Sequence, residues 1–255
     1  MKKLILIAAM AAIADVFAVQ GTLVTETETL KGDIRWQGRN KQYIVSIMKG
    51  KTPIEMERKL EDVVRLDIPV PAGFEKAVSQ VEEGQGLAAI PVLSKIVSTY
   101  RMLQWDKPAG RYLVLAYLSA DQIQKAYDAC QPIISEDKSA AYSGDLASAY
   151  WQTLLKLGKY NQLEALLKKA AASGSRQTSA AALVMRGDII VASSNDNPEK
   201  LREALRDGYL RVVLMYQDAE CRRECGEAML KAAAVFDKLQ QSGRAEKLRT
   251  QAKSI

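Results

Sequence analysis

The chain has 255 residues, with 36 Lys and Arg against 30 Asp and Glu, which gives a formal net charge of +6 at pH 7. Apolar residues make up 48% and charged residues 26%, values that are ordinary for a globular protein and exclude wholesale disorder. The sequence contains no histidine, which excludes Ser-His-Asp and Cys-His nucleophile arrangements, histidine acid–base catalysis and histidine metal ligands. We therefore expect a non-enzymatic protein with no cofactor and no metal site.

The first 18 residues have the layout of a secretory signal peptide. Lys2 and Lys3 form a basic start, residues 4–14 form an apolar run, and residues 16–18 form a small-residue cleavage site. The apolar run is shorter than the roughly 20 residues that span a membrane. We therefore expect a mature chain that begins near Val19 and is periplasmic or secreted, which argues against a nucleic-acid partner. The alternative is that residues 1–18 form an uncleaved buried helix.

Residues 19–70 have the pattern of a small β-domain. Strands are expected at 22–30, 33–36, 41–47, 54–58 and 63–68, with turns at 37–40 and 48–51 and one helical turn at 60–62. Five short strands with a helical turn before the last resemble a small SH3-like barrel. A β-meander docked on the first helical repeat fits the same pattern, and a helix over 54–66 is a further alternative. Pro69 and Pro71 end this domain, because proline interrupts a strand and restricts the residue before it.

Residues 71–255 are expected to be helical throughout. The apolar periodicity predicts paired helices at 73–83 and 87–103, at 109–119 and 121–134, within 142–172 on either side of a turn at 157–161, at 177–193 and 199–216, and at 218–240 and 243–253. Four turn residues, Gly84, Asp121, Gly158 and Asn195, are each 37 residues apart. Gly243 is expected to begin a last, divergent copy after a longer interval. The pattern indicates about five helix-turn-helix repeats over residues 72–253.

The segment 142–172 resembles a tetratricopeptide repeat (TPR), a helix-turn-helix unit of about 34 residues. The residues that carry the resemblance are Ala147, Leu154, Gly158, Tyr160, Leu163, Leu167 and Ala170. The match departs from the family at Trp151, where a small residue is preferred. The fold class that the resemblance implies is mostly α, an α-solenoid of about five degenerate repeats over 71–255, preceded by the small β-domain at 19–70. An irregular helical bundle is the alternative.

The resemblance to TPR proteins implies a protein-interaction function. We expect an exported adaptor or scaffold for a protein or peptide partner in a bacterial envelope, pilus or secretion complex. Tyr112, Tyr117, Tyr150 and Trp151 are the candidate partner-binding residues, because aromatic side chains often anchor partners. Trp151 must either turn toward a binding groove or push the helices apart. A second hypothesis is a glycan- or peptidoglycan-binding module that uses an exposed platform of Trp36 and Tyr43 in the β-domain.

The three cysteines leave two interpretations open. Cys221 and Cys225 are four residues apart on one helix face, which allows a strained disulfide in an exported protein. Cys130 lies at a core position of the second repeat. The alternative is that all three are buried or half-buried thiols. A metal site is not expected, because the sequence supplies too few further Cys or His ligands.

Overall fold

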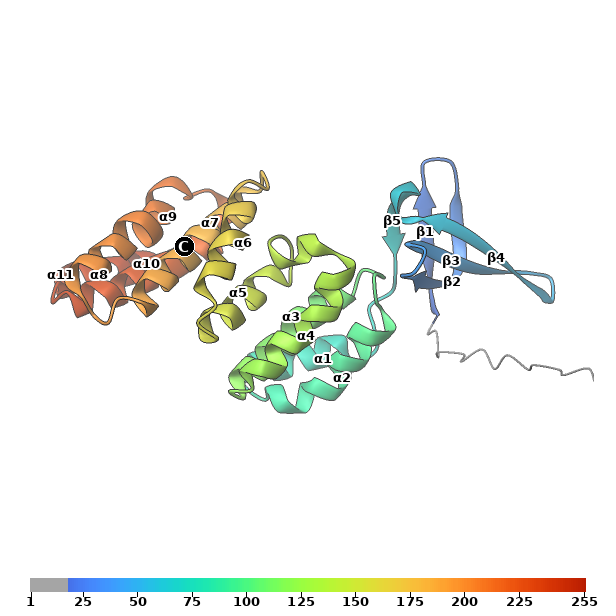
Figure 1. The fold of residues 1–255 in the computed structure, drawn as a ribbon, viewed down its shortest axis with the longest axis horizontal. Coiled ribbons are helices and arrows are strands. Elements are labelled where there is room, and N and C mark those ends of the chain that lie inside the picture. Colours follow the sequence, from blue (N-terminus) through green and yellow to red (C-terminus); the bar gives the residue numbers. More distant parts are fainter. Residues whose placement is uncertain (1–17) are drawn as a thin grey trace, which may run out of the picture. The chain divides into compact units, whose positions relative to one another are not determined.

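The computed structural model describes residues 18–255 and divides them into two compact units (Figure 1). The β-unit consists of the described residues up to Pro71 together with Ile96–Asp106, and the helical unit consists of Ala72–Lys95 with Lys107–Ile255. The signal peptide expected at residues 1–18 lies outside the described residues except for its last position. The described chain is mostly helical and begins with an antiparallel sheet.

The β-unit contains a five-stranded antiparallel sheet with the strand order β4-β3-β2-β1-β5. The elements are β1 (Val19–Thr25), β2 (Thr29–Gln37), β3 (Gln42–Lys49), β4 (Thr52–Lys59), a 3-10 turn η1 (Leu60–Asp62) and β5 (Val63–Asp67). Leu23 lies opposite Leu30 of β2 and Leu66 of β5, so the apolar alternation sets the register. The hairpin at 38–41 and the helical turn at 60–62 agree with expectation, and 54–66 forms strands and this turn rather than a helix.

The Thr-rich run 22–30, expected as a single strand, is instead the end of β1, a turn and the start of β2. The hydroxyl oxygen of Thr25 accepts hydrogen bonds from the backbone N–H groups of Thr27 (3.3 Å) and Glu28 (3.1 Å). A threonine side chain that satisfies two turn amides offers the backbone an alternative to the strand ladder. The turn is therefore encoded by the same Thr residues that favour the strands on either side.

The core of the β-unit is completed by the segment between the second and third helices. Leu103 is 1% exposed and belongs to the same apolar cluster as Leu23, Ile34 and Val45 of the sheet. The helix expected over 87–103 ends at Thr99, and the chain then runs irregularly to Trp105. Tertiary packing overrides the helical periodicity here, because these side chains are buried against the sheet instead of against another helix.

Three hydrogen bonds fasten this segment to the sheet. The hydroxyl of Tyr43 donates to the carbonyl of Met102 (3.0 Å), and the indole N–H of Trp105 donates to the carbonyl of Ile68 (2.9 Å). The backbone N–H of Ile68 donates to the side-chain oxygen of Gln104 (3.1 Å). Residues 96–106 are therefore part of the β-unit, although the chain reaches them only after the first helix pair has begun.

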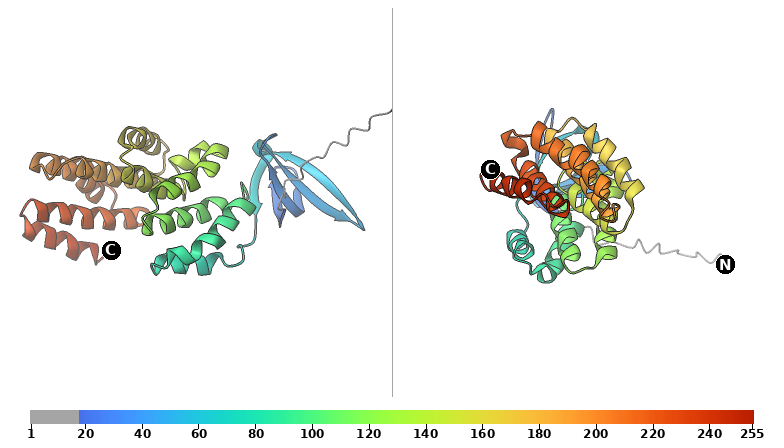
Figure 2. Two further views of the ribbon diagram at one scale, coloured as in Figure 1. Left: turned by 60° about the horizontal axis from the view of Figure 1, so that its bottom comes forward. Right: turned by 90° about the vertical axis from the view of Figure 1, so that its left-hand side faces the viewer.

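The helical unit is built from helix pairs joined by short turns (Figure 2). The helices are α1 (Phe74–Glu82), α2 (Gly86–Thr99), α3 (Asp106–Ser119), α4 (Ile123–Glu136), α5 (Ala147–Lys156), α6 (Tyr160–Ala171), α7 (Arg176–Ala192), α8 (Pro198–Ala204), α9 (Leu210–Met215), α10 (Arg222–Lys238) and α11 (Ser242–Ala252). Three short segments complete it: the 3-10 turns η2 (Lys138–Ala141) and η4 (Ala219–Cys221), and the π-helical turn η3 (Leu205–Tyr209). The order agrees with the expected pairs, except that the helix expected over 199–216 is formed by α8, η3 and α9.

The turns that repeat every 37 residues share one backbone conformation. Gly84, Asp121, Gly158 and Asn195 have φ angles of 80°, 56°, 66° and 47°, all in the left-handed region. Gly, Asn and Asp adopt this region most readily, which is why the sequence marks these turns so clearly. The last turn is different, because Gln240 (φ 60°) is left-handed and Gly243 lies inside α11.

Glycine allows close approach of the π-helical turn η3 to α7. A Cβ added at Gly208 would lie 2.7 Å from the Cα of Gly187, and one added at Gly187 would lie 2.5 Å from the ring of Tyr209. The backbone of η3 at Gly208 therefore contacts the backbone of α7 at Gly187, and the ring of Tyr209 packs on the same glycine. This contact holds the α8–η3–α9 segment firmly against α7.

Candidate protein-binding surface

The four aromatic residues proposed from sequence do not form one exposed surface. Tyr112 and Tyr117 on α3 are half-buried, and the ring of Tyr112 packs edge-on against Phe74 at 6.2 Å. Tyr150 on α5 is buried against Tyr127, and its hydroxyl accepts a hydrogen bond from Gln162 (2.9 Å). Burial raises the pKa of Tyr150 to about 12. These contacts account for Tyr112 and Tyr150 as packing residues within the helical unit.

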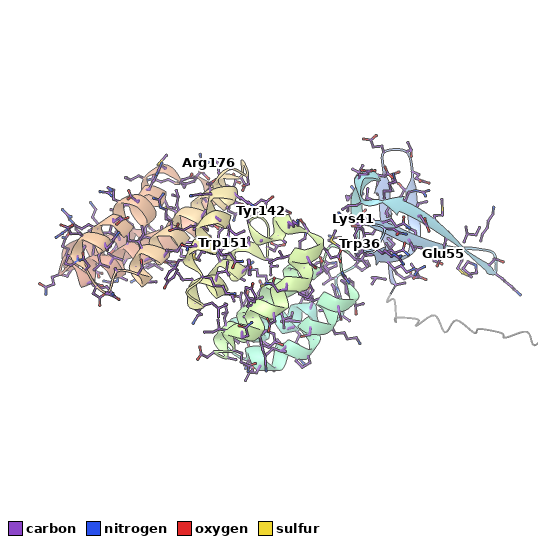
Figure 3. All side chains as sticks on the ribbon, viewed as in Figure 1. Trp36, Lys41, Glu55, Tyr142, Trp151 and Arg176 are labelled. Carbon is purple, nitrogen blue, oxygen red and sulfur yellow. The ribbon has the colours of Figure 1, made fainter. Side chains whose placement is uncertain are left out.

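Trp151 is buried in the helical core, with 1% of its surface exposed (Figure 3). Its indole N–H donates to the carbonyl of Ala141 (2.9 Å), which ends the 3-10 turn η2 between α4 and α5. The connection between α4 and α5 is longer than the other turns. Its backbone contacts Trp151, which stands at a position where the repeat family prefers a small residue. Trp151 therefore neither faces a groove nor lies unsatisfied between helices.

The strongest candidate for a binding surface is a groove of about 420 Å³ near the C-terminal end of the helical unit. We call it the arginine-rimmed groove. It is lined by Arg202, Leu205, Arg206, Leu210, Arg211, Leu214, Met215, Phe236, Leu239, Gln241 and Arg244. Segments α8, η3 and α9 supply one wall, and the end of α10 with the start of α11 supplies the other. Its size is within the range of small-ligand and side-chain pockets.

Local sequence explains why α8, η3 and α9 present an apolar stripe to this groove. Asn197 caps α8 by accepting hydrogen bonds from the N–H groups of Glu199 (2.9 Å) and Lys200 (3.3 Å), and Pro198 follows at the first turn. The N–H of Leu210 bonds to the carbonyl of Leu205, five residues earlier, as in a π-helical turn.

The extra residue in the π-helical turn decides which side chains face the groove. Gly208 and Tyr209 turn toward α7, while Leu205 and Leu210 both line the groove. An uninterrupted α-helix places residues five apart on different faces. Leu214, four residues after Leu210, extends the stripe and is 75% exposed. Such an exposed leucine beside an apolar groove is typical of an interaction surface.

The rim of the groove is strongly basic. Its lining holds four arginines and no carboxylate. Arg206 is paired with the neighbouring Asp207, at 2.9 Å for both of its hydrogen bonds, whereas Arg202 and Arg211 form no ion pair with any residue in 18–255. The hydrogen bonds from Arg206, together with the charges of Arg186 and Arg211, hold the pKa of Asp207 below its usual range. The positive charges of Arg186, Arg206 and Arg211 therefore all act on the Asp207 carboxylate beside the groove.

The sequence did not reveal this surface. Arg202, Arg206 and Arg211 alternate with Leu205 and Leu210, but the π-helical turn breaks the 3.6-residue period, so the stripe is not visible as one helical face. The one feature of the sequence that indicates this surface is the spacing of its arginines, four residues from Arg202 to Arg206 and five from Arg206 to Arg211.

A partly buried polar cluster lies behind the π-helical turn. The hydroxyl of Tyr209 donates to Asp188 on α7 (2.7 Å), and Lys231 on α10 contacts the second oxygen of Asp188 (2.5 Å). Burial, and then the charge of Asp188, raise the pKa of Tyr209 well above its usual value, so the phenol stays protonated and donates. The cluster joins α7, η3 and α10, which gives the arginine-rimmed groove a fixed back wall.

The cysteines are free thiols in the structure. Cys130, Cys221 and Cys225 are all buried, so the disulfide that the spacing of Cys221 and Cys225 allowed is not formed in it. Burial raises the pKa of Cys130 to about 12 and that of Cys221 to about 11. Thiols with raised pKa values are poor nucleophiles, because the thiolate is the reactive form.

Two further features of the described residues bear on the type of protein. No group of three or more acidic or cysteine side chains in residues 18–255 is placed to hold a metal ion. Over the same range, no helix combines the length and the apolar character needed to cross a bilayer.

No protein-family model matches this chain, and no curated protein matches it. Among solved structures, it is similar to the TPR-like repeats of a putative kinesin light chain from Podosopora anserina and to a variant of that protein. Both are 15% identical over 72% of this chain and 92% of theirs, with a TM-score of 0.44 for the protein and 0.45 for its variant. The similarity concerns the fold alone, and the assignment of helical repeats rests on the turns and helix pairs of this chain.

Proposed function

We propose that this chain is an exported, non-enzymatic adaptor that binds a protein partner at the arginine-rimmed groove of its helical-repeat unit. The observation that carries the proposal is a preformed groove with an apolar floor, exposed Leu214 and Met215, and two arginines without ion-pair partners. Arginine, methionine and aromatic side chains are enriched in protein interfaces, and the lining of the groove contains all three. The partner is an envelope protein, and the complex is one of envelope, pilus or secretion assembly.

The proposal also assigns the β-unit as an SH3-like module. Its strand order and the 3-10 turn η1 before the last strand support that assignment. The glycan-binding alternative required an exposed platform of Trp36 and Tyr43. Tyr43 is buried, its hydroxyl donates to the carbonyl of Met102, and the ring of Trp36 lies 4.9 Å from its ring. The alternative therefore loses the feature that motivated it.

Export is tested by the N-terminus of the protein in its native host. We expect the intact mass of the purified protein to correspond to a chain that begins at or near Val19, because the basic start, apolar run and small-residue site favour cleavage after Ala18. Full-length protein recovered from the cytosol would contradict export. It would leave the groove prediction intact, because that prediction does not depend on location.

The groove is tested by comparing two leucine variants in capture of the native partner. We expect Leu214→Asp to reduce the amount of cross-linked partner at least about tenfold, because the substitution places a carboxylate on the apolar wall and removes buried contact area. Leu230→Asp is the matched control, since Leu230 is also an exposed leucine (54%) but does not line the groove. If both variants captured as much partner as the unsubstituted protein, or if only Leu230→Asp lost it, the partner would bind elsewhere.

A further inference from the structure

We infer that the arginine-rimmed groove binds an acidic segment of its partner, with apolar side chains in the groove and carboxylates on Arg202 and Arg211. This inference rests on the proposed function and adds the chemistry of the partner. It begins from the contrast between the floor and the rim. The floor is formed by Leu205, Leu210 and Phe236, and the rim by arginines.

Charge complementarity indicates that the bound segment of the partner is negatively charged. Four guanidinium groups around one apolar hollow repel one another and attract carboxylates, and Arg forms bidentate pairs with carboxylates. Arg206 already has Asp207, and Arg244 donates to Gln241 (2.9 Å) and lies over the ring of Phe236 at 5.7 Å. Arg202 and Arg211 have no ion-pair partner among residues 18–255. These two are therefore the groups that an incoming acidic segment would engage.

The N-terminal segment of the chain, residues 1–17, does not have the negative charge that would complement the groove. Residues 1–17 carry Lys2 and Lys3 against a single acidic residue, Asp15, so this segment would bring further positive charge to the arginines. An acidic partner segment satisfies both the apolar floor and the basic rim.

An anionic membrane surface also combines negative charge with apolar groups, and the shape of the site distinguishes the two. The groove is a hollow between α8–η3–α9 on one side and the end of α10 with the start of α11 on the other. A helix that lies on a bilayer presents a continuous apolar face instead. The apolar residues Leu205 and Phe236 are buried at the bottom of the hollow, where a partner side chain reaches and a flat surface does not.

The inference is tested by selecting peptides from a randomised display library against residues 19–255. We expect the selected peptides to combine several Asp or Glu with Leu, Phe or Trp, and to bind more weakly as salt is raised. The double variant Arg202→Gln with Arg211→Gln should weaken their binding at least about tenfold, which corresponds to about 1.4 kcal/mol. The matched control, Arg222→Gln with Arg223→Gln on α10, removes the same charge away from the groove and should change affinity less than about twofold.

Three results would overturn the inference. Selected peptides that are neutral or basic would do so, as would acidic peptides that bind both double variants equally. Binding to phosphatidylglycerol vesicles that is lost in the Arg202 and Arg211 variant, without selection of acidic peptides, would assign the groove to a membrane. If the native partner is still captured in a Leu214-dependent manner in any of these cases, the proposed function stands and only the acidic chemistry is wrong.

Discussion

Trp151→Ala should lower the free energy of unfolding of the helical unit by about 3–5 kcal/mol, the usual cost of truncating a buried large aromatic side chain. The indole fills a site that is 1% exposed, and its N–H satisfies the carbonyl of Ala141. The alanine variant therefore leaves both a cavity and an unpaired buried carbonyl. Chemical denaturation followed by far-ultraviolet circular dichroism measures the loss.

Trp151→Phe separates the two contributions. Phenylalanine retains most of the volume but cannot donate to Ala141, so we expect an intermediate loss of about 1–3 kcal/mol. Affinity for the partner should be unchanged in both variants wherever they remain folded, because Trp151 lies in the core. An unchanged stability together with lost partner affinity would return Trp151 to the role of binding anchor that its unusual position in the repeat first suggested.

Leu103→Ala should destabilise the β-unit by about 2–5 kcal/mol, although Leu103 lies outside the strands in sequence. Its side chain completes the apolar cluster of the sheet and is 1% exposed. We expect faster hydrogen exchange of amides in β2 and β3, with little change in α5–α11. Hydrogen exchange is the suitable measurement, because two units need not unfold in one transition.

Leu87→Ala is the matched control for this prediction. Leu87 lies near the start of α2, the helix that precedes the segment containing Leu103, but it is 62% exposed, so its truncation should change stability by less than about 0.5 kcal/mol. Equal exchange rates in β2 and β3 for both variants would mean that the sheet does not depend on the segment that contains Leu103.

The parts of the fold that could be predicted from sequence are those that local chemistry encodes. Left-handed turns at Gly84, Gly158 and Asn195 require residues that tolerate positive φ, and the 37-residue period of such residues located the helix pairs. Leu154 and Leu163, two of the residues that carry the resemblance to the repeat family, lie on the apolar stripes of their helices, and both are fully buried.

The parts that could not be predicted depend on contacts between segments far apart in sequence. Nothing local indicates that Leu103 leaves a helical pattern to enter the β-unit. Trp151 departs from the repeat pattern, and only the tertiary structure reveals that η2 accommodates it. The groove depends on a π-helical turn that places Leu205 and Leu210 on one side, and no simple periodicity describes that arrangement.

The central claim is that the partner binds at the arginine-rimmed groove. The most direct test is the hydrogen-exchange footprint of the native partner on residues 19–255. We predict protection concentrated in 202–215 and 236–244, the two walls of the groove, with the strands of the β-unit unaffected. Protection confined to residues 19–67, with the two walls exchanging as in the free protein, would contradict the account and place the binding surface on the sheet.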